Sequence, residues 1–241
     1  MLLLYLDIPK LIQTLEDPEM RKHMSQISRI GLLLLILPIF LFIGCSDKEE
    51  APGALAMGDE EFEAWEIALV EMRIEKNEDF SRPETSPLPA GDIEGFEGLN
   101  YYFPKAELRF ETPFIAEAGT DTVSLTKRKG QIVPYIRRGK LAFSNQGQVY
   151  NLEVFGPADT ADGDYLWLPF YDDTSGKDTY GGGRYLDVNI DSEGMVDLDF
   201  NYAYNPLCDY NPDRYNCTLP PAANKLGFAV EAGEKSFHAA H

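Results

Sequence analysis

Short apolar segments recur about every ten residues between 99 and 229, and they limit what this chain can fold into. They are rich in Val, Ile, Tyr and Phe, and they are separated by Gly, Asp, Asn and Pro. Because no helical periodicity lies between them, the pattern predicts a mainly β fold, an antiparallel β-sandwich or barrel. Residues 140–154 read as a hairpin that turns at Asn145-Gln146-Gly147. The predicted strands are Leu99–Phe103, Glu107–Thr112, Thr122–Thr126, Ile132–Ile136, Lys140–Ser144, Val149–Phe155, Tyr165–Tyr171, Gly183–Val188, Met195–Phe200 and Leu226–Ala229.

One amphipathic helix is predicted ahead of the strands, from Asp59 to about Asn77. Asp59 is suited to cap it, and the next two acidic residues suit the positive end of the helix dipole. We expect its apolar stripe to pack on the β domain. The predicted boundaries are 59–80 for the helix, 81–237 for the β domain and 238–241 for a tail. The stripe consists of Phe62, Trp65, Leu69 and Met72.

The N-terminal region carries an apolar run of 15 residues, 30–44, after Arg29 and directly before Cys45. A helix that spans a membrane needs about 20 apolar residues, and Pro38 interrupts this run. The pattern is typical of a secretory signal. It resembles a bacterial lipoprotein signal with Phe42–Cys45 as the lipobox, which implies that Cys45 takes the lipid. The alternative is a plain membrane anchor with an incidental cysteine.

The residues around this signal are assigned by their charge and composition. A signal's charged region should adjoin its apolar core, so we interpret 1–23 as a mis-assigned upstream extension and 24–44 as the signal peptide. Met20 and Met24 are the two candidate starts, and a long native leader is the alternative. Residues 45–58 are small and polar and predict a flexible tether. The acidic run after Cys45 resembles a surface-export signal.

The charge and the histidines exclude several classes of function. The net charge of −19 argues against nucleic acid and against electrostatic docking on anionic lipid. The three histidines are His23, His238 and His241, outside the predicted strands, so no Ser-His or Cys-His nucleophile is expected in the β domain. No zinc or calcium pattern is complete. We therefore expect no metal and no cofactor.

Arg184 lies among glycines and apolar residues where a strand would bury it, and a buried guanidinium needs a carboxylate or several carbonyls. The candidate carboxylates are Asp187, Asp199 and Glu234. Gly181–Gly183 before it lacks the Lys-Ser/Thr ending of a phosphate loop, so a bulge or a close backbone approach is favoured.

The strand that begins near Arg184 and the strand that ends at Phe200 are joined by the short link Asn189–Gly194, which favours an antiparallel hairpin. Pairing these strands would bring polar side chains from both into one pocket or polar cluster. The six candidate ligand-binding residues are Tyr180, Arg184, Asp199, Asn201, Tyr204 and Asn205.

Cys208 and Cys217 remain as an even pair once Cys45 is set aside, and an oxidising compartment favours a disulfide between them, with free or redox-active thiols as the alternative. Eight segments over roughly residues 65–236 carry a family resemblance. They are Arg73–Asn77, Ser86–Leu88, Gly98–Pro104, Thr179–Tyr185, Asp199–Cys208, Cys217–Pro221, Asn224–Leu226 and Ala232–Lys235. With these segments the chain resembles the bacterial family of uncharacterised proteins called domain of unknown function 1684, but it departs from the family's usual prolines at Leu207 and Thr218. The resemblance implies a domain without an established activity.

Three functions fit these features. The first is a non-catalytic module that binds a sugar or a peptide, because tyrosines crowd the stretch 165–215 together with Asn and Asp. The second is an envelope hydrolase that uses Glu75 or Asp199 with Arg184. The third is a structural or assembly lipoprotein. In each case we expect the protein on the bacterial cell envelope, outside the cytoplasm, with the outer-membrane bilayer as partner through its acyl anchor and surface exposure as a further expectation.

Overall fold

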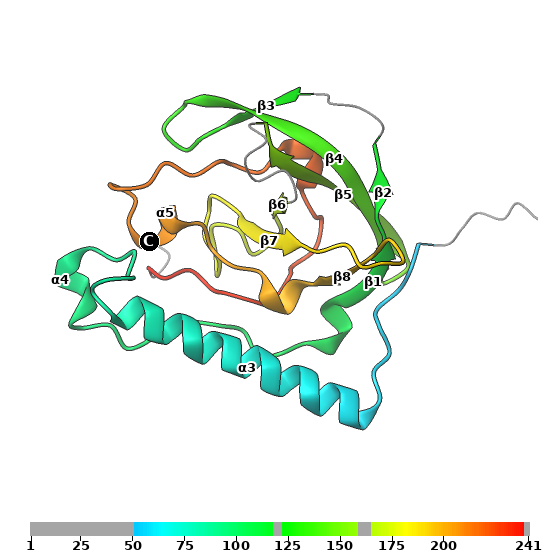
Figure 1. Ribbon diagram of the computed structural model, residues 1–241, viewed down its shortest axis with the longest axis horizontal. Helices are drawn as coiled ribbons and strands as arrows, with labels where there is room; N and C mark the ends of the chain where they lie inside the picture. The colour runs from blue at the N-terminus through cyan, green and yellow to red at the C-terminus, as the bar shows by residue number, and fades with distance from the viewer. Residues whose placement is uncertain (1–50, 118–121, 159–164, 239–241) are drawn as a thin grey trace, which may run out of the picture. The chain divides into compact units, whose positions relative to one another are not determined.

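The computed structural model describes residues 51–117, 122–158 and 165–238. The fold is mainly antiparallel β, as predicted, with two sheets in a sandwich-like arrangement and one longer N-terminal helix (Figure 1). A six-stranded sheet has the order β2-β4-β5-β6-β7, and β3 also pairs with β4. A two-stranded sheet pairs β1 with β8. The strands are β1 Arg109–Pro113, β2 Ile115–Ala116, β3 Thr122–Thr126, β4 Ile132–Asn145, β5 Gln148–Pro157, β6 Leu166–Phe170, β7 Arg184–Val188 and β8 Met195–Asp199.

The predicted hairpin is confirmed as β4 and β5, which pair up to Asn145 and Gln148. Gln146 and Gly147 form its two-residue turn, and both have positive φ, as a type I′ turn requires. β4 joins two predicted strands into one because the chain continues through an irregularity at Arg137 and Gly139. Such a bulge lets a long strand bend without ending.

The predicted hairpin between the Arg184 strand and the Phe200 strand is wrong. β7 pairs with β6, while β8 pairs with β1 in the other sheet, with Phe110 opposite Leu198. The short link 189–194 therefore connects two sheets that pack on each other. The physical reason is burial, because Phe110 and Leu198 are both in the main core and pairing β8 with β1 places them there.

Two further predicted strands are absent from the described residues, since 99–103 and 226–229 form no strand there. Tyr101 makes an isolated bridge with Glu234, and Lys225 makes one with Tyr171. The predicted tether is also corrected in part, because 51–58 contacts the domain. Leu55 N donates to the carbonyl of Arg109 at 2.7 Å, so this segment covers β1.

The long helix α3 (Asp59–Ser81) is four residues longer than the predicted end at Asn77. Its N-cap is Gly58, without a side-chain cap bond, so the predicted cap at Asp59 is wrong. Trp65 and Leu69 are buried as the stripe predicts, whereas Phe62 is exposed. The remaining helical elements are short: α4 Ala90–Ile93 and α5 Leu207–Tyr210, with 3-10 turns at Ala106–Leu108, Phe200–Tyr202 and Ala222–Asn224.

The six-stranded sheet is apolar on both faces where β6 meets β7. Leu168 and Leu186 belong to the main core, which also holds Phe110 from β1. Trp167 and Tyr185 belong to a second cluster, because successive side chains of a strand point to opposite faces. This second, aromatic face is the foundation of the candidate site.

No helix in the described ranges is long and apolar enough to cross a membrane.

Candidate functional site

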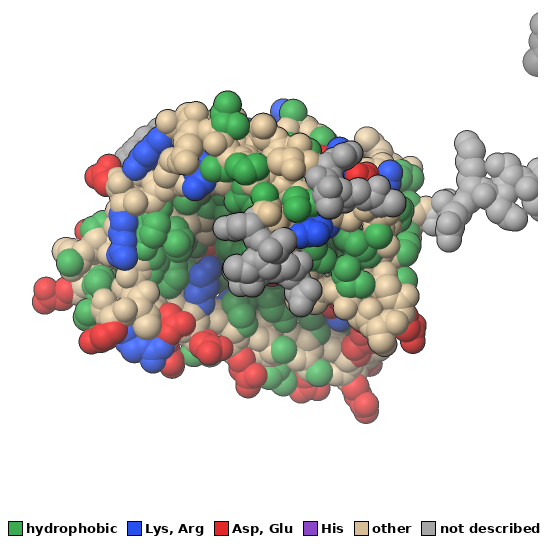
Figure 2. All heavy atoms as spheres, turned by 45° about the horizontal axis from the view of Figure 1, so that its top comes forward, with side chains coloured by type: hydrophobic (Ala, Val, Ile, Leu, Met, Phe, Trp, Pro, Cys, Tyr) green, Lys and Arg blue, Asp and Glu red, His purple; other side chains and the backbone are tan. Residues whose placement is uncertain are grey.

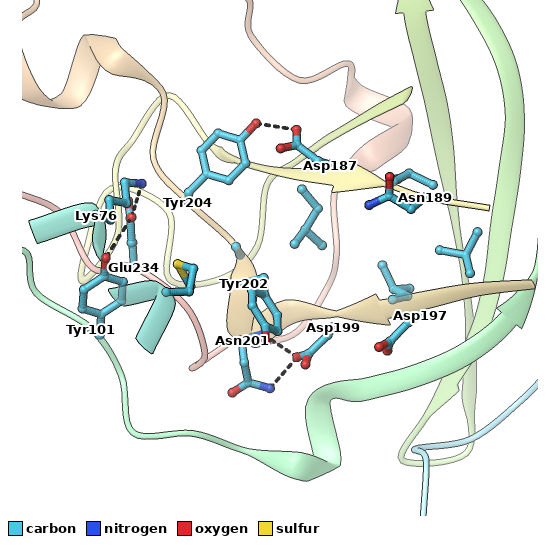
Figure 3. Close-up of a pocket in the computed structure, with 16 residues that line it drawn as sticks. Lys76, Tyr101, Asp187, Asn189, Asp197, Asp199, Asn201, Tyr202, Tyr204 and Glu234 are labelled. Atoms are coloured by element: carbon cyan, nitrogen blue, oxygen red, sulfur yellow. Dashed lines mark hydrogen bonds and ion pairs between the residues drawn. The ribbon is translucent and has the colours of Figure 1, made fainter. Parts of the chain in front are cut away.

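A cavity of about 660 Å³ lies where α3 faces β7, β8 and the segment that follows β8 (Figure 3). We call it the polar cavity. Three of the six predicted residues line it together: Asp199, Asn201 and Tyr204. Its full lining is Met72, Lys76, Tyr101, Leu186, Asp187, Val188, Asn189, Val196, Asp197, Leu198, Asp199, Asn201, Tyr202, Ala203, Tyr204 and Glu234.

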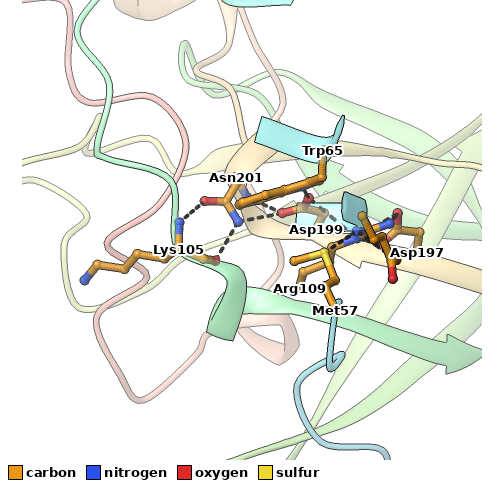
Figure 4. Close-up of polar contacts among 8 residues, drawn as sticks. Met57, Trp65, Lys105, Arg109, Asp197, Asp199 and Asn201 are labelled. Carbon is orange, nitrogen blue, oxygen red and sulfur yellow. Dashed lines mark hydrogen bonds and ion pairs between the residues drawn. The ribbon is translucent and has the colours of Figure 1, made fainter. Parts of the chain in front are cut away.

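Asp199 braces one end of the polar cavity (Figure 4). Its carboxylate accepts hydrogen bonds from Trp65 Nε1 at 2.6 Å, Asn201 N at 2.8 Å and Asn201 Nδ2 at 2.7 Å. Asn201 in turn bonds both the N–H and the carbonyl of Lys105. Burial raises the pKa of Asp199, and these hydrogen bonds partly oppose the rise. Asp199 therefore ties α3 to the end of β8.

Glu234 lies at the other end of the polar cavity, where several polar groups surround it, and is only 2% exposed. Its carboxylate pairs with Lys76 Nζ from α3 and accepts hydrogen bonds from Tyr210 OH and Asn205 N. Tyr101 OH lies 3.4 Å from the same group. Figure 3 shows Lys76, Tyr101 and Glu234 gathered at this end. The cluster joins segments that are far apart in the chain.

A second cavity of about 500 Å³ shares Lys76 and Tyr204 with the polar cavity. We call it the aromatic cavity. Hydrophobic side chains gather in a hollow of the face seen in Figure 2, with basic side chains around it. The cavity's lining is Lys76, Phe80, Lys127, Tyr135, Tyr165, Trp167, Tyr185, Tyr204, Asn205, Pro206, Leu207, Tyr210, Tyr215, Asn216, Cys217 and Thr218.

The predicted disulfide between Cys208 and Cys217 is confirmed, with their Cα atoms 5.9 Å apart. The closed loop supplies much of one wall of the aromatic cavity, including Tyr210 and Tyr215. The cross-link restricts the conformations of this loop, and so it limits how far the wall can move.

Arg184 is buried as predicted, at 1% exposed, but the carboxylates proposed for it are wrong. Its ion-pair partner is Asp172, and its guanidinium also donates to the carbonyls of Val230, Ala232 and Glu234. Asp172 was not predicted as the partner because it follows β6, the strand before Arg184. No pattern in the residues around Asp172 indicates that its side chain meets Arg184. Arg184 lines none of the three described cavities and holds the C-terminal segment against β7.

The backbone of another segment lies close to the glycine triplet Gly181–Gly183, as the sequence indicated. Gly183 has φ +83°, and a Cβ there would lie 2.7 Å from the carbonyl oxygen of Phe170. Only glycine fits such a position without strain.

The remaining predicted residues lie apart from one another. Asn205 lines the aromatic cavity, where its Nδ2 donates to Asp209 at 2.9 Å. Tyr180 lines a third cavity of about 250 Å³ that also contains Arg128. The six predicted residues therefore do not converge on one pocket.

The residues paired in the hydrolase hypothesis do not meet either. Glu75 is exposed on α3, and Arg184 is held by Asp172 rather than by Asp199. Within the described part of the chain, no group of His, Cys, Asp and Glu is arranged to hold a metal ion.

The aromatic cavity as a whole was not predicted from the sequence. Trp167 and Tyr135 were predicted only as strand residues, Lys76 only as part of a motif, and Lys127 was not singled out. The signal for this cavity in the sequence was the crowding of tyrosines between 165 and 215. A tyrosine has an apolar ring and a polar hydroxyl, and it therefore suits the wall of a cavity or an interface.

Residues 94–235 match the family described as "Protein of unknown function (DUF1684)". The chain belongs to the DUF1684 family. The matched region holds most of both cavity walls, whereas Lys76 and the rest of α3 precede it.

A solution NMR structure of an uncharacterised protein from Haloarcula marismortui is similar to this DUF1684 chain. The TM-score is 0.57 at 35% sequence identity, and the match covers 74% of this chain and 97% of that one. A comparison with curated proteins finds no match.

Proposed function

We propose that this DUF1684 protein is a non-catalytic binding module of the bacterial cell envelope that takes a sugar in the aromatic cavity. The observation that carries the proposal is the lining itself, in which six tyrosines and one tryptophan border about 500 Å³. A cavity of this size suits a small ligand, and aromatic rings offer sugars a large apolar surface at low entropic cost.

The tyrosine hydroxyls favour ring stacking as the main contact. Tyr165 and Tyr204 both donate to Asp187 Oδ1 at 2.8 Å, and Tyr185 donates to the carbonyl of Thr218. Burial and Asp187 raise the pKa of Tyr165 and Tyr204, so both stay protonated donors. With their hydrogens engaged, these residues offer ring faces and oxygen lone pairs, which suit the C–H face and the hydroxyls of a sugar.

A peptide is the less favoured ligand. An extended peptide usually binds by adding a strand to an open sheet edge. The edge of β7 is already covered beside the cavity, since Tyr185 and Tyr204 exchange two backbone hydrogen bonds of 2.9 and 3.0 Å.

Sugar binding is tested by titrating the full chain with a panel of oligosaccharides and of peptides in a calorimeter. Tyr165 is 46% exposed at the cavity, so Tyr165→Ala should weaken sugar binding about tenfold with little loss of stability. Phe103, 91% exposed and absent from the cavity lining, gives the matched control Phe103→Ala with unchanged affinity. Binding of peptides alone would replace the sugar proposal, and equal affinity for both variants would refute this site.

The envelope anchor is a separate proposal, and Cys45 lies outside the described residues. We propose that the chain is cleaved before Cys45 and lipidated there, because the apolar run of 15 residues is too short to span a bilayer. Metabolic labelling with a fatty-acid analogue should mark the wild type and leave Cys45→Ala unlabelled. An unlabelled wild type, or label that persists in the variant, would contradict the anchor.

A further inference from the structure

The aromatic cavity departs from the charge of the whole chain. The protein has 40 acidic and 21 basic residues, yet the described residues that line this cavity include two lysines and no Asp or Glu. The carboxylates of this region lie on the polar cavity instead, among them Asp187 and Glu234. A lysine in this lining that is left without a carboxylate partner would attract a ligand with negative charge.

Lys76 is already neutralised. Its Nζ pairs with Glu234, which is buried, and lies 5.3 Å from the ring centre of Tyr204 and 5.9 Å from that of Tyr210. Withdrawing Lys76 from this cluster would leave a buried carboxylate without its cation. Lys76 is therefore part of the wall and is not free to pair with a ligand.

Lys127 differs from Lys76 in this respect. Its side chain is half-buried, and among the described residues its Nζ has neither an ion pair nor a hydrogen bond. Its backbone is fixed, since Lys127 N donates to the carbonyl of Gln131 at 2.7 Å and Lys127 bridges to Thr218 on the opposite wall segment. The fold thus places an available ammonium group at the edge of a set of aromatic rings.

We propose that the ligand is an acidic sugar of the hexuronic acid type, whose ring stacks on the tyrosines and whose carboxylate pairs with Lys127. The inference rests on the proposed function, because it names the ligand class of the same cavity. The ring hydroxyls donate to tyrosine oxygens whose own hydrogens are engaged, such as Tyr185 and Tyr204. The carboxylate of the sugar pairs with the ammonium group of Lys127, the one charged donor in the described lining that has no ion pair.

The test is calorimetric titration of the full chain with two oligosaccharides of identical linkage, one ending in glucuronic acid and one in glucose. The wild type should bind the acidic ligand at least about tenfold more tightly than the neutral one, as a charged hydrogen bond in a partly dry site implies. Lys127→Gln should remove this preference, while Lys127→Arg should retain most of it.

Lys129→Gln is the matched control, because it removes the same charge two residues away. Lys129 is exposed, and its Nζ donates to the backbone carbonyl of Asp213. This variant should keep the preference for the acidic ligand. Equal binding of both ligands in the wild type, unaffected by Lys127→Gln, would overturn the acidic-sugar inference and leave the sugar proposal standing. Absence of binding to either ligand would overturn both.

Discussion

Arg184→Ala should lower the free energy of unfolding by roughly 3 to 5 kcal/mol, because it leaves the buried carboxylate of Asp172 without its cation. Both side chains of this pair are fully buried, so water cannot replace the lost contact. The carbonyls of Val230, Ala232 and Glu234 lose their donor as well. Among the described residues, the carboxylate of Asp172 then keeps only the N–H and the hydroxyl of Thr174 as donors.

Thermal unfolding measures this effect, and the melting temperature should fall by roughly 6 to 20 °C. The melting temperature of Arg184→Lys should lie between those of the wild type and Arg184→Ala. One ammonium group cannot reproduce a planar guanidinium that bonds a carboxylate and three carbonyls. Arg82→Ala is the control, because Arg82 and Asp79 form an exposed ion pair that is worth little. If Arg184→Ala melted with the wild type but lost ligand binding, Arg184 would be a ligand residue and its structural role would be refuted.

Glu234→Ala should cost about 3 kcal/mol, because one buried carboxylate satisfies donors from three segments. Its removal leaves Lys76 without an ion pair and Tyr210 OH and Asn205 N without an acceptor. These groups form the boundary between the polar and aromatic cavities, so the variant should also weaken the proposed sugar binding. Glu234→Gln should lose less, since it keeps an acceptor oxygen in place but not the charge.

Chemical denaturation of Glu234→Ala beside Glu231→Ala gives the comparison. Glu231 lies three residues earlier and pairs with Lys105 on the surface, where its side chain is 52% exposed. Glu231→Ala should stay within about 0.5 kcal/mol of the wild type. Equal denaturation midpoints for the two variants would show that the Glu234 cluster contributes nothing to stability.

The sequence alone determined the features that depend on neighbouring residues. The recurring apolar segments predicted an antiparallel β fold, and Asn145-Gln146-Gly147 predicted the turn between β4 and β5. Backbone dihedral preferences and the alternation of side chains act over a few residues, so they can be read locally. The burial of Arg184 followed from its apolar neighbours in the same way.

Tertiary structure decided which distant segments meet. β8 pairs with β1 rather than with β7, Arg184 with Asp172, and Lys76 with Glu234, 158 residues away. Each of these contacts depends on how several buried faces pack at once, and a short link or an acidic residue nearby does not specify the partner. The aromatic cavity has the same origin. Trp167 and Tyr135 line it because packing placed the second face of the six-stranded sheet opposite the disulfide loop, a juxtaposition that no local pattern encodes.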